Sequence, residues 1–396
     1  MKKKANIVYV RNFISLIFIS AFLINKKKNS EKYILILNKQ NFNKKNFDYF
    51  KNFFFNYFQE IIFIDYKKTI LVWSSKNKLK KISLLIRNLL FNKFYYFYKR
   101  SNDIKKLSLL IKGIIIKYDI EKVYGGGDNI ELAVQLITKK KIQSYWIEHG
   151  VGNFTDSINL RNNIFIKSLL NFLFKFRISN YEITNYIGYI TVLGHKIKNN
   201  ILNKHFNYLN LNLKKNTLMK NKINVKIKDI NTIINNLISY TNLSKPRTNK
   251  DFVYFDFSAH PVPTNSNKVK KTLRSIYGVI DKKKEIILLK HKTHVKNIGY
   301  NFQSALLKDL KKNKVKIINF NKYPFQMLPA EVIIKLYKVK KTISYESSAI
   351  IFSHILYKNM RNYIFYSYLM NVKNMPKLWW QCISILRKSF RKIKFI

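Results

Sequence analysis

The chain has 396 residues, of which 47% are hydrophobic, and its 75 Lys and Arg against 20 Asp and Glu give a formal net charge of +55. This length exceeds what one compact core fills and predicts two domains, while the apolar content argues against an intrinsically disordered chain. The charge predicts attraction to anionic membranes, nucleotide phosphates or acidic glycans, and the sequence lacks the zinc-finger spacing, RNP-like motif and heptad-plus-basic region of common nucleic-acid-binding domains.

Apolar strands alternate with helical segments along the amino-terminal half. We expect strands at residues 6–10, 32–37, 61–65, 122–125, 145–147 and 189–193. The apolar stretch at 13–24 contains Ser15 and Ser20 and is shorter than the roughly 20 residues of a membrane span, so it predicts a buried helix and not a signal peptide or anchor. Strands that alternate with helices indicate βαβ units and a parallel sheet.

The most informative stretch follows the expected strand at 145–147. There the chain continues with Glu148, His149 and Gly150, and Gly152 follows shortly after. Because the glycines permit a sharp turn, Glu148 and His149 are expected at the carboxyl end of a strand, the edge at which open α/β sheets bind ligands. The alternative is an ordinary strand-turn with a solvated acid.

A glycine turn at 125–127 precedes Asp128 and Glu131. It lacks the spacing of a dinucleotide-binding loop and the Lys-Ser/Thr pair of a P-loop, so we interpret it as a strand-end turn that faces a cleft. In this interpretation Asp128 and Glu131 are candidate contacts to an acceptor substrate.

A second series of strands begins after a change in composition. Residues 196–250 are rich in Asn, Lys and Leu without a clear period, and further strands are expected at 252–257, 285–290, 315–319 and 341–345. The sequence thus predicts an α/β protein with two Rossmann-like domains facing across a cleft, at 1–195 and 251–375, joined by the interdomain region 196–250. A basic amphipathic helix is expected at 376–396.

Three features lie at successive strand ends of the second half. Lys292 and His294 belong to a cluster of cations. Glu331 lies in the first turn of an expected helix. Ser347 and Ser348 lie at a helix amino terminus, where hydroxyls and free N–H groups form an anion site. The alternatives are a solvated charge run, an ordinary helix start and a helix cap.

The order of these features resembles the bacterial sialyltransferase and polysialyltransferase family: an acidic residue before a glycine turn, then Lys-x-His, Pro-x-Glu and Ser-Ser. The resemblance implies the two-domain GT-B fold, with Glu148 as the general base. One departure concerns the turn, which reads Glu148-His149-Gly150 where the family has two acidic residues. If the second position supplies the base, His149 would take the proton, and otherwise His149 and Gly150 lie on the acceptor side.

On the donor side the resemblance implies that His294, together with Lys292, contacts the donor phosphate. A second departure is Val295, which stands where the family has a proline after the histidine. His260 is followed by Pro261 and therefore matches the family's His-Pro pair. However, one more βα unit separates it from the Pro-x-Glu segment than the order of the family motifs allows. We therefore prefer His294 and keep His260 as a donor-loop contact.

The same resemblance places Glu331 on the cytidine ribose, and Ser347 and Ser348 on the donor phosphate. It implies an inverting transfer of sialic acid, or a related nonulosonic acid, from a CMP-activated donor to a cell-surface glycan such as capsule or lipooligosaccharide. Charge grows on the departing phosphate, which a histidine, a lysine and a helix amino terminus would stabilise. The sequence contains neither an Asp-x-Asp pair nor a His/Cys cluster at metal spacing, so we expect a metal-independent reaction without a cofactor.

The carboxyl-terminal stretch 376–396 combines Trp379 and Trp380 with several Lys and Arg. This pattern predicts a helix at an anionic membrane interface, and the alternative is a helix that packs on the first domain. The single cysteine, Cys382, excludes a disulfide framework and favours a reducing compartment. We therefore expect a cytoplasmic enzyme that is peripheral on the inner face of the plasma membrane and has no specific nucleic-acid partner.

Two other interpretations remain open. The first is a different GT-B nucleotide-sugar transferase or an epimerase, which a preference for uridine or guanosine donors would reveal. The second is a non-enzymatic basic protein bound to membrane or nucleic acid, which would show salt-sensitive binding without turnover.

Overall fold

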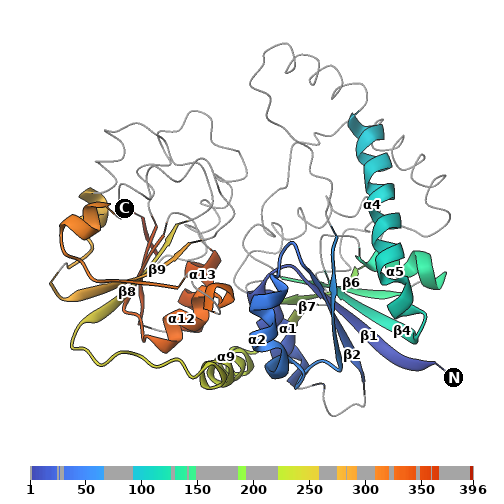
Figure 1. The fold of residues 1–396 in the computed structure, drawn as a ribbon, viewed down its shortest axis with the longest axis horizontal. Helices are drawn as coiled ribbons and strands as arrows, with labels where there is room; N and C mark the ends of the chain where they lie inside the picture. The colour runs from blue at the N-terminus through green and yellow to red at the C-terminus, as the bar shows by residue number, and fades with distance from the viewer. Residues whose placement is uncertain are drawn as a thin grey trace.

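Two parallel β-sheets covered by helices make up the part of the chain that the computed structural model describes (Figure 1). That part comprises residues 2–24, 26, 31–66, 92–125, 130–140, 142–148, 186–192, 222–257, 274–281, 283–291, 308–320, 325–344, 348–357, 359–364 and 393–395.

The first sheet has seven parallel strands in the order β3-β2-β1-β4-β5-β6-β7. Its strands are β1 (Lys3–Val10), β2 (Tyr33–Asn38), β3 (Glu60–Ile64), β4 (Tyr118–Gly125), β5 (Gln143–Ile147), β6 (Tyr186–Thr191) and β7 (Lys222–Asn224). The central strands are apolar on both faces, as strands of a parallel sheet covered on both sides require. The strand order reverses direction between β1 and β4, which makes this a doubly wound sheet.

Helices cover both faces of the first sheet. One face carries α1 (Phe13–Ile24), α2 (Lys44–Phe54) and α9 (Ile227–Thr241), and the other carries α4 (Asn92–Ile115) and α5 (Ile130–Thr138) (Figure 1). Side chains along a strand point alternately to the two faces of the sheet, so successive residues of β1 pack into the cores on opposite sides. Val8 and Val10 join the core under α1, and Ile7 and Tyr9 join the core under α4.

The second sheet has six parallel strands in the order β10-β9-β8-β11-β12-β13. Its elements are β8 (Asp251–Phe257), β9 (Glu285–His291), β10 (Ile317–Asn319), the 3-10 helix η2 (Phe325–Met327), α12 (Ala330–Leu336), β11 (Lys341–Ser344), α13 (Ser348–Leu356), β12 (Arg361–Ile364) and β13 (Ile393–Phe395). Phe252 and Tyr254 of β8 pack with Ile333 of α12 in its core. This sheet is also doubly wound, with its reversal between β8 and β11.

Helices of the two sheets meet in one continuous apolar core. Phe18 of α1 packs edge-on against Phe352 of α13 with ring centroids 4.8 Å apart, and Tyr49 of α2 packs against Phe325 of η2 at 6.1 Å. Buried residues of α9 and α12 belong to the same core. The helices α1, α2 and α9 therefore lie between the two sheets (Figure 1).

A strand and a helix lie within residues 196–250, the range expected to separate the domains. The strand β7 pairs with β6, and α9 packs against α1. The buried side of α9 carries Ile230, Ile233, Ile234 and Leu237, whose spacing of three and four residues is that of an amphipathic helix. Where the structure describes this range up to Thr241, it belongs to the first sheet and its helices.

Three residues of the stretch 376–396, for which the sequence predicts a helix, form a strand. Residues 393–395 form β13, which pairs in parallel with β12. Ile393 is buried and Lys394 is exposed, as the alternation of side chains along a strand predicts. Residues 376–392 lie outside the described residues. Among the helices that the structure describes, none combines the length and the apolar character needed to cross a bilayer.

Candidate functional site

Glu148 lies at the carboxyl end of the first sheet, where the sequence predicts a ligand-binding edge. The strand β5 ends at Ile147, and the N–H of Glu148 still donates to the carbonyl of Ile190 at 3.0 Å. This bond continues the pairing with β6, so the main chain of Glu148 is fixed by its neighbouring strand. The Glu148 side chain is fully buried.

Two donors from the end of β6 orient the carboxylate of Glu148. Its Oε2 accepts hydrogen bonds from the Thr191 hydroxyl at 2.7 Å and from the Val192 N–H at 2.6 Å. Hydrogen bonds to a carboxylate are stronger than those between neutral groups. Because Thr191 and Val192 are themselves buried, the carboxylate is held in one position at the strand end.

The turn between β1 and α1 supports the same residue from the other side. Ser15 in the first turn of α1 donates its hydroxyl to the carbonyl of Glu148 at 2.8 Å. Asn12 caps this turn, because its Oδ1 accepts the Ser15 N–H at 2.9 Å. Glu148 thus connects the ends of β1, β5 and β6.

Tyr189 lies close to the Glu148 carboxylate inside the sheet core. Burial, and then the negative charge of Glu148, raise the pKa of Tyr189 well above its usual value. The phenol therefore stays protonated at neutral pH. The sequence did not identify the residues that surround Glu148: Ser15, Tyr189, Thr191 and Val192. The only local indication of them is the hydroxyl of Thr191 at the end of an apolar strand.

Gly125, the last residue of β4, lies where β4 and the start of α5 approach each other closely. A Cβ on Gly125 would lie 3.0 Å from Cγ2 of Ile130 at the start of α5 and 3.6 Å from Cβ of Tyr9 in β1. A Cβ at this position would require Ile130 to shift by a few tenths of an ångström, so a glycine suits the close approach of α5 to the strand. Glu131, in the first turn of α5, is buried, which suits an acid at a helix amino terminus. Asp128 lies outside the described residues.

On the second sheet, Glu331 occupies the first turn of α12, as the Pro-x-Glu pattern predicts. The helix begins after Pro329, and Glu331 is 3% exposed. Tyr357 donates its hydroxyl to the main-chain carbonyl of Glu331 at 2.8 Å. Burial, and then the negative charge of Glu331, raise the pKa of Tyr357 well above its usual value, so the carboxylate lies near this phenol.

The strand β11 ends at Ser344, which is buried, and α13 begins at Ser348, so a helix start follows this strand end as expected. The structure therefore gives side-chain positions for Glu131 and Glu148 in the first sheet and its helices and for Glu331 in the second. The remaining predicted site residues lie outside the described residues: Asp128, His149, Gly150, His260, Lys292, His294 and Ser347.

Charged clusters also occur at the opposite, amino-terminal edges of both sheets. Before β2, Glu31 pairs with Lys122 of β4 at 3.1 Å and accepts the Tyr33 hydroxyl at 2.5 Å. At the starts of β9 and β11, Glu285 pairs with Lys341 at 2.5 Å. Each pair spans one intervening strand, β1 in the first sheet and β8 in the second. Both pairs lie away from the edge at which doubly wound sheets bind ligands.

Metal ligands form no cluster in the part of the chain that the structure describes: no three His, Cys, Asp or Glu side chains lie close enough to share an ion. A reaction without a metal stays a prediction from the sequence.

Comparison with known sequences gives no relative: no protein-family model matches the chain, and no curated protein matches it. Solved structures do match. The UDP-GlcNAc 2-epimerase from Methanocaldococcus jannaschii superposes with a TM-score of 0.52 at 13% identity, covering 99% of this chain and 88% of that one.

UGT89C1 from Arabidopsis thaliana, complexed with UDP-L-rhamnose, gives a TM-score of 0.52 at 9% identity, covering 100% of this chain and 85% of that one. At such identities the likeness concerns the fold. Both similar proteins have two Rossmann-like domains in the GT-B arrangement, and the two doubly wound parallel sheets described above follow the same plan. The fold expected from the sequence is confirmed: this chain has the GT-B fold.

Proposed function

We propose that the chain is a glycosyltransferase that takes its sugar from a nucleotide-activated donor. The observation that carries the proposal is the Glu148 carboxylate, which Thr191 and Val192 hold at the carboxyl edge of one sheet of a GT-B fold. Ligands of doubly wound sheets bind at this edge. The two similar structures support a nucleotide sugar as the ligand, since one is a UDP-GlcNAc 2-epimerase and the other is complexed with UDP-L-rhamnose.

We assign the acceptor to the first sheet and the donor to the second. On the second sheet, Glu331 lies in the first turn of α12, the position that the motif resemblance gives to the residue that holds the donor ribose. A carboxylate there can accept hydrogen bonds from the two ribose hydroxyls, which are donors. The helix start at Ser348, directly after β11, supports a phosphate site, because a helix amino terminus attracts anions.

The chemical step requires a proton acceptor on the first sheet. The acceptor hydroxyl forms a bond to the anomeric carbon while the bond from that carbon to the donor phosphate breaks, and the hydroxyl proton passes to a base. We assign this base to Glu148 of the Glu148-His149 turn. The hydrogen bonds to Oε2 orient the carboxylate, and His149 is the competing assignment.

Two donor classes have support from different sources. The similar structures support uridine diphosphate sugars. The Lys-x-His, Pro-x-Glu and Ser-Ser motifs support a CMP-activated nonulosonic acid. Both fit the same proposal, because the base and the phosphate site serve any nucleotide sugar.

A panel of sugar nucleotides tests the proposal. The purified full chain is incubated with UDP-GlcNAc, CMP-sialic acid and GDP-mannose, with and without oligosaccharide acceptors, and the products are identified by NMR. Nucleotide release together with a lengthened acceptor establishes a transferase and names the donor. An epimerised UDP sugar formed without an acceptor establishes the second candidate, an epimerase, which the Methanocaldococcus structure favours. No consumption of any donor would overturn both.

A further inference from the structure

The helix α4 exposes large apolar side chains to solvent. Among the described residues, the large hydrophobic side chains that are more than one third exposed are Phe55 at 43%, Leu109 at 72%, Leu110 at 44%, Ile116 at 48% and Ile227 at 36%. Three of these five lie within eight consecutive residues at the end of α4 and in the turn that follows it. A cluster of exposed apolar side chains marks an interaction site more often than single ones do.

Lysines surround these apolar side chains. Lys105, Lys106, Lys112 and Lys117 are all exposed, and residues 104–117 include no acidic residue. Residues three or four apart are neighbours on a helix surface, so Lys105 and Lys112 flank Leu109, while Lys106 lies beside Leu110. We call the exposed side of residues 105–117 the outer face of α4.

The opposite side of the same helix is buried in the protein core. Ile104, Leu107, Ile111 and Ile115 are buried between α4, α5 and the first sheet. The exposed leucines therefore do not result from a loosely packed helix, because the apolar residues that the core requires are already in place. In Figure 1, α4 lies on the side of the first sheet away from the second sheet.

We propose that the outer face of α4 docks on an anionic lipid bilayer. Exposed Leu and Ile flanked by Lys is the pattern of a helix that lies in a membrane interface, with apolar side chains in the acyl region and ammonium groups at the headgroups. The lysines alone would attract a nucleic acid or an acidic glycan, and binding of either would not require an exposed apolar side chain such as Leu109. A second copy of the chain is disfavoured, because two surfaces with four lysines each and no acid repel each other.

The docking surface is independent of the sugar chemistry. The outer face of α4 belongs to the side of the first sheet opposite α1, α2 and α9, so a bilayer on it does not cover the helices that contact the second sheet. Membrane binding can therefore be measured on the full chain without any donor or acceptor.

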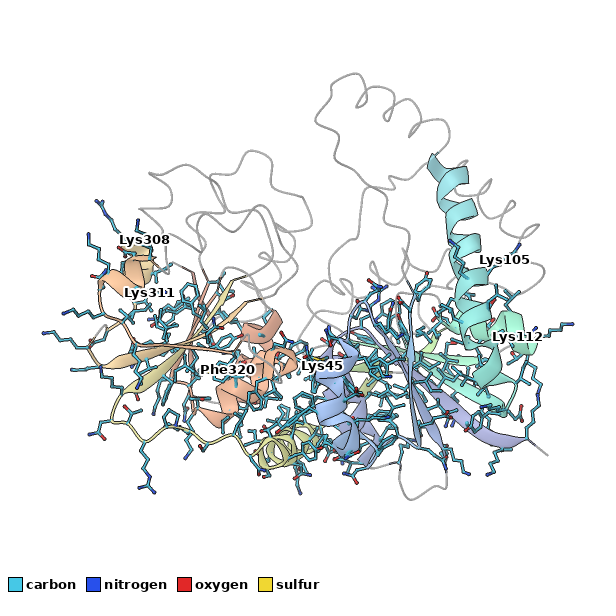
Figure 2. All side chains as sticks on the ribbon, viewed as in Figure 1. Lys45, Lys105, Lys112, Lys308, Lys311 and Phe320 are labelled. Atoms are coloured by element: carbon cyan, nitrogen blue, oxygen red, sulfur yellow. The ribbon has the colours of Figure 1, made fainter. Side chains whose placement is uncertain are left out.

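Vesicle co-sedimentation tests the surface, with phosphatidylcholine vesicles compared with vesicles that also contain phosphatidylglycerol. The charge variant is Lys105→Gln/Lys112→Gln, and the matched control is Lys308→Gln/Lys311→Gln, two exposed lysines of the second sheet unit (Figure 2). We expect the full chain to bind only the anionic vesicles. The charge variant should weaken binding by roughly tenfold or more, since each lysine near an anionic surface contributes measurably, and the control should change it much less.

The apolar contribution requires its own variant. Leu109→Gln/Ile116→Gln keeps helix propensity and charge but removes the side chains that would enter the bilayer. We expect roughly tenfold weaker binding, and little change in the control Phe55→Gln, which removes an exposed apolar side chain elsewhere. Circular dichroism of all variants should match the parent, because every substituted side chain is exposed.

Three results would overturn the proposal. Binding that falls in the lysine variant but not in Leu109→Gln/Ile116→Gln, and that a short RNA or heparin abolishes, would identify a polyanion site instead. Binding that both α4 variants leave unchanged, but that Trp379→Gln/Trp380→Gln abolishes, would place the membrane contact in the carboxyl-terminal stretch. No binding of the parent chain to anionic vesicles would exclude the surface altogether.

Discussion

Removal of the Glu148 side chain should weaken the fold, whereas a change of its charge alone should not. In Glu148→Ala, the Thr191 hydroxyl and the Val192 N–H lose their common acceptor at positions that are 0% and 1% exposed. A buried donor left without its partner costs about 1–3 kcal/mol, so the two together predict a loss of about 2–6 kcal/mol. The hydrogen bond from Ser15 survives, because it goes to the main-chain carbonyl.

Glu148→Gln provides the control for this loss. Both donors share the single oxygen Oε2, and the amide oxygen of glutamine can occupy that place. We therefore expect an unfolding free energy within about 1 kcal/mol of the parent, close to the typical net value of one hydrogen bond. Thr191→Val, which removes one donor and keeps the other, should lie between the two variants.

The assay is urea unfolding followed by circular dichroism at neutral pH, with ligand absent. From high to low, we expect the midpoints in the order parent, Glu148→Gln, Thr191→Val, Glu148→Ala. Equal midpoints for Glu148→Ala and the parent would show that the carboxylate does not stabilise the end of β6.

Three further predictions concern other parts of the molecule. Glu331→Gln should raise the donor KM by roughly tenfold through a weakened bond to the ribose, and an unchanged KM in steady-state kinetics would exclude that contact. Burial acts to raise the pKa of Glu31, but the hydrogen bonds from Tyr33 and Lys122 hold this pKa below its usual 4.5. Its contribution to stability is therefore present above that pH and lost as the pH falls below it, so Glu31→Gln should flatten the acid side of the stability profile, and an unaltered profile would contradict the linkage. Phe352→Ala should cost about 3–5 kcal/mol in urea unfolding, because this buried ring joins the cores of the two sheets, and a loss below about 1 kcal/mol would show that the helices between the sheets contribute little.

Most strands could be predicted from the sequence, whereas β7 and β13 could not. The strands β1, β2 and β3 are runs of Ile, Leu, Val and Phe between polar turns, which local pattern alone identifies. The three-residue strands β7 and β13 carry too few residues to show a period. The helix α9 could not be predicted from the sequence, because Asn and Lys occupy positions between its buried isoleucines and the surrounding composition resembles that of a linker.

The position of Glu148 could be predicted, because an apolar strand followed by glycines indicates a strand end. Its partners could not, because Thr191 and Ser15 lie 43 and 133 residues away along the chain and approach it only through strand pairing and helix packing. Two Rossmann-like domains could be predicted from two series of alternating elements, and the motif resemblance implied the GT-B fold. The nucleotide of a donor does not follow from the fold, which the similar structures share with this chain at identities of 13% and 9%.

The most direct test of Glu148 as the base is the rate of sugar transfer by Glu148→Gln, measured with the donor that the parent chain uses and compared with the rate of His149→Ala. If Glu148 takes the acceptor proton, transfer should fall by roughly 10² to 10⁴ while donor affinity stays close to that of the parent, and His149→Ala should be the milder change. Transfer by Glu148→Gln at close to the parent rate, with His149→Ala inactive, would contradict the assignment and give the proton to the imidazole.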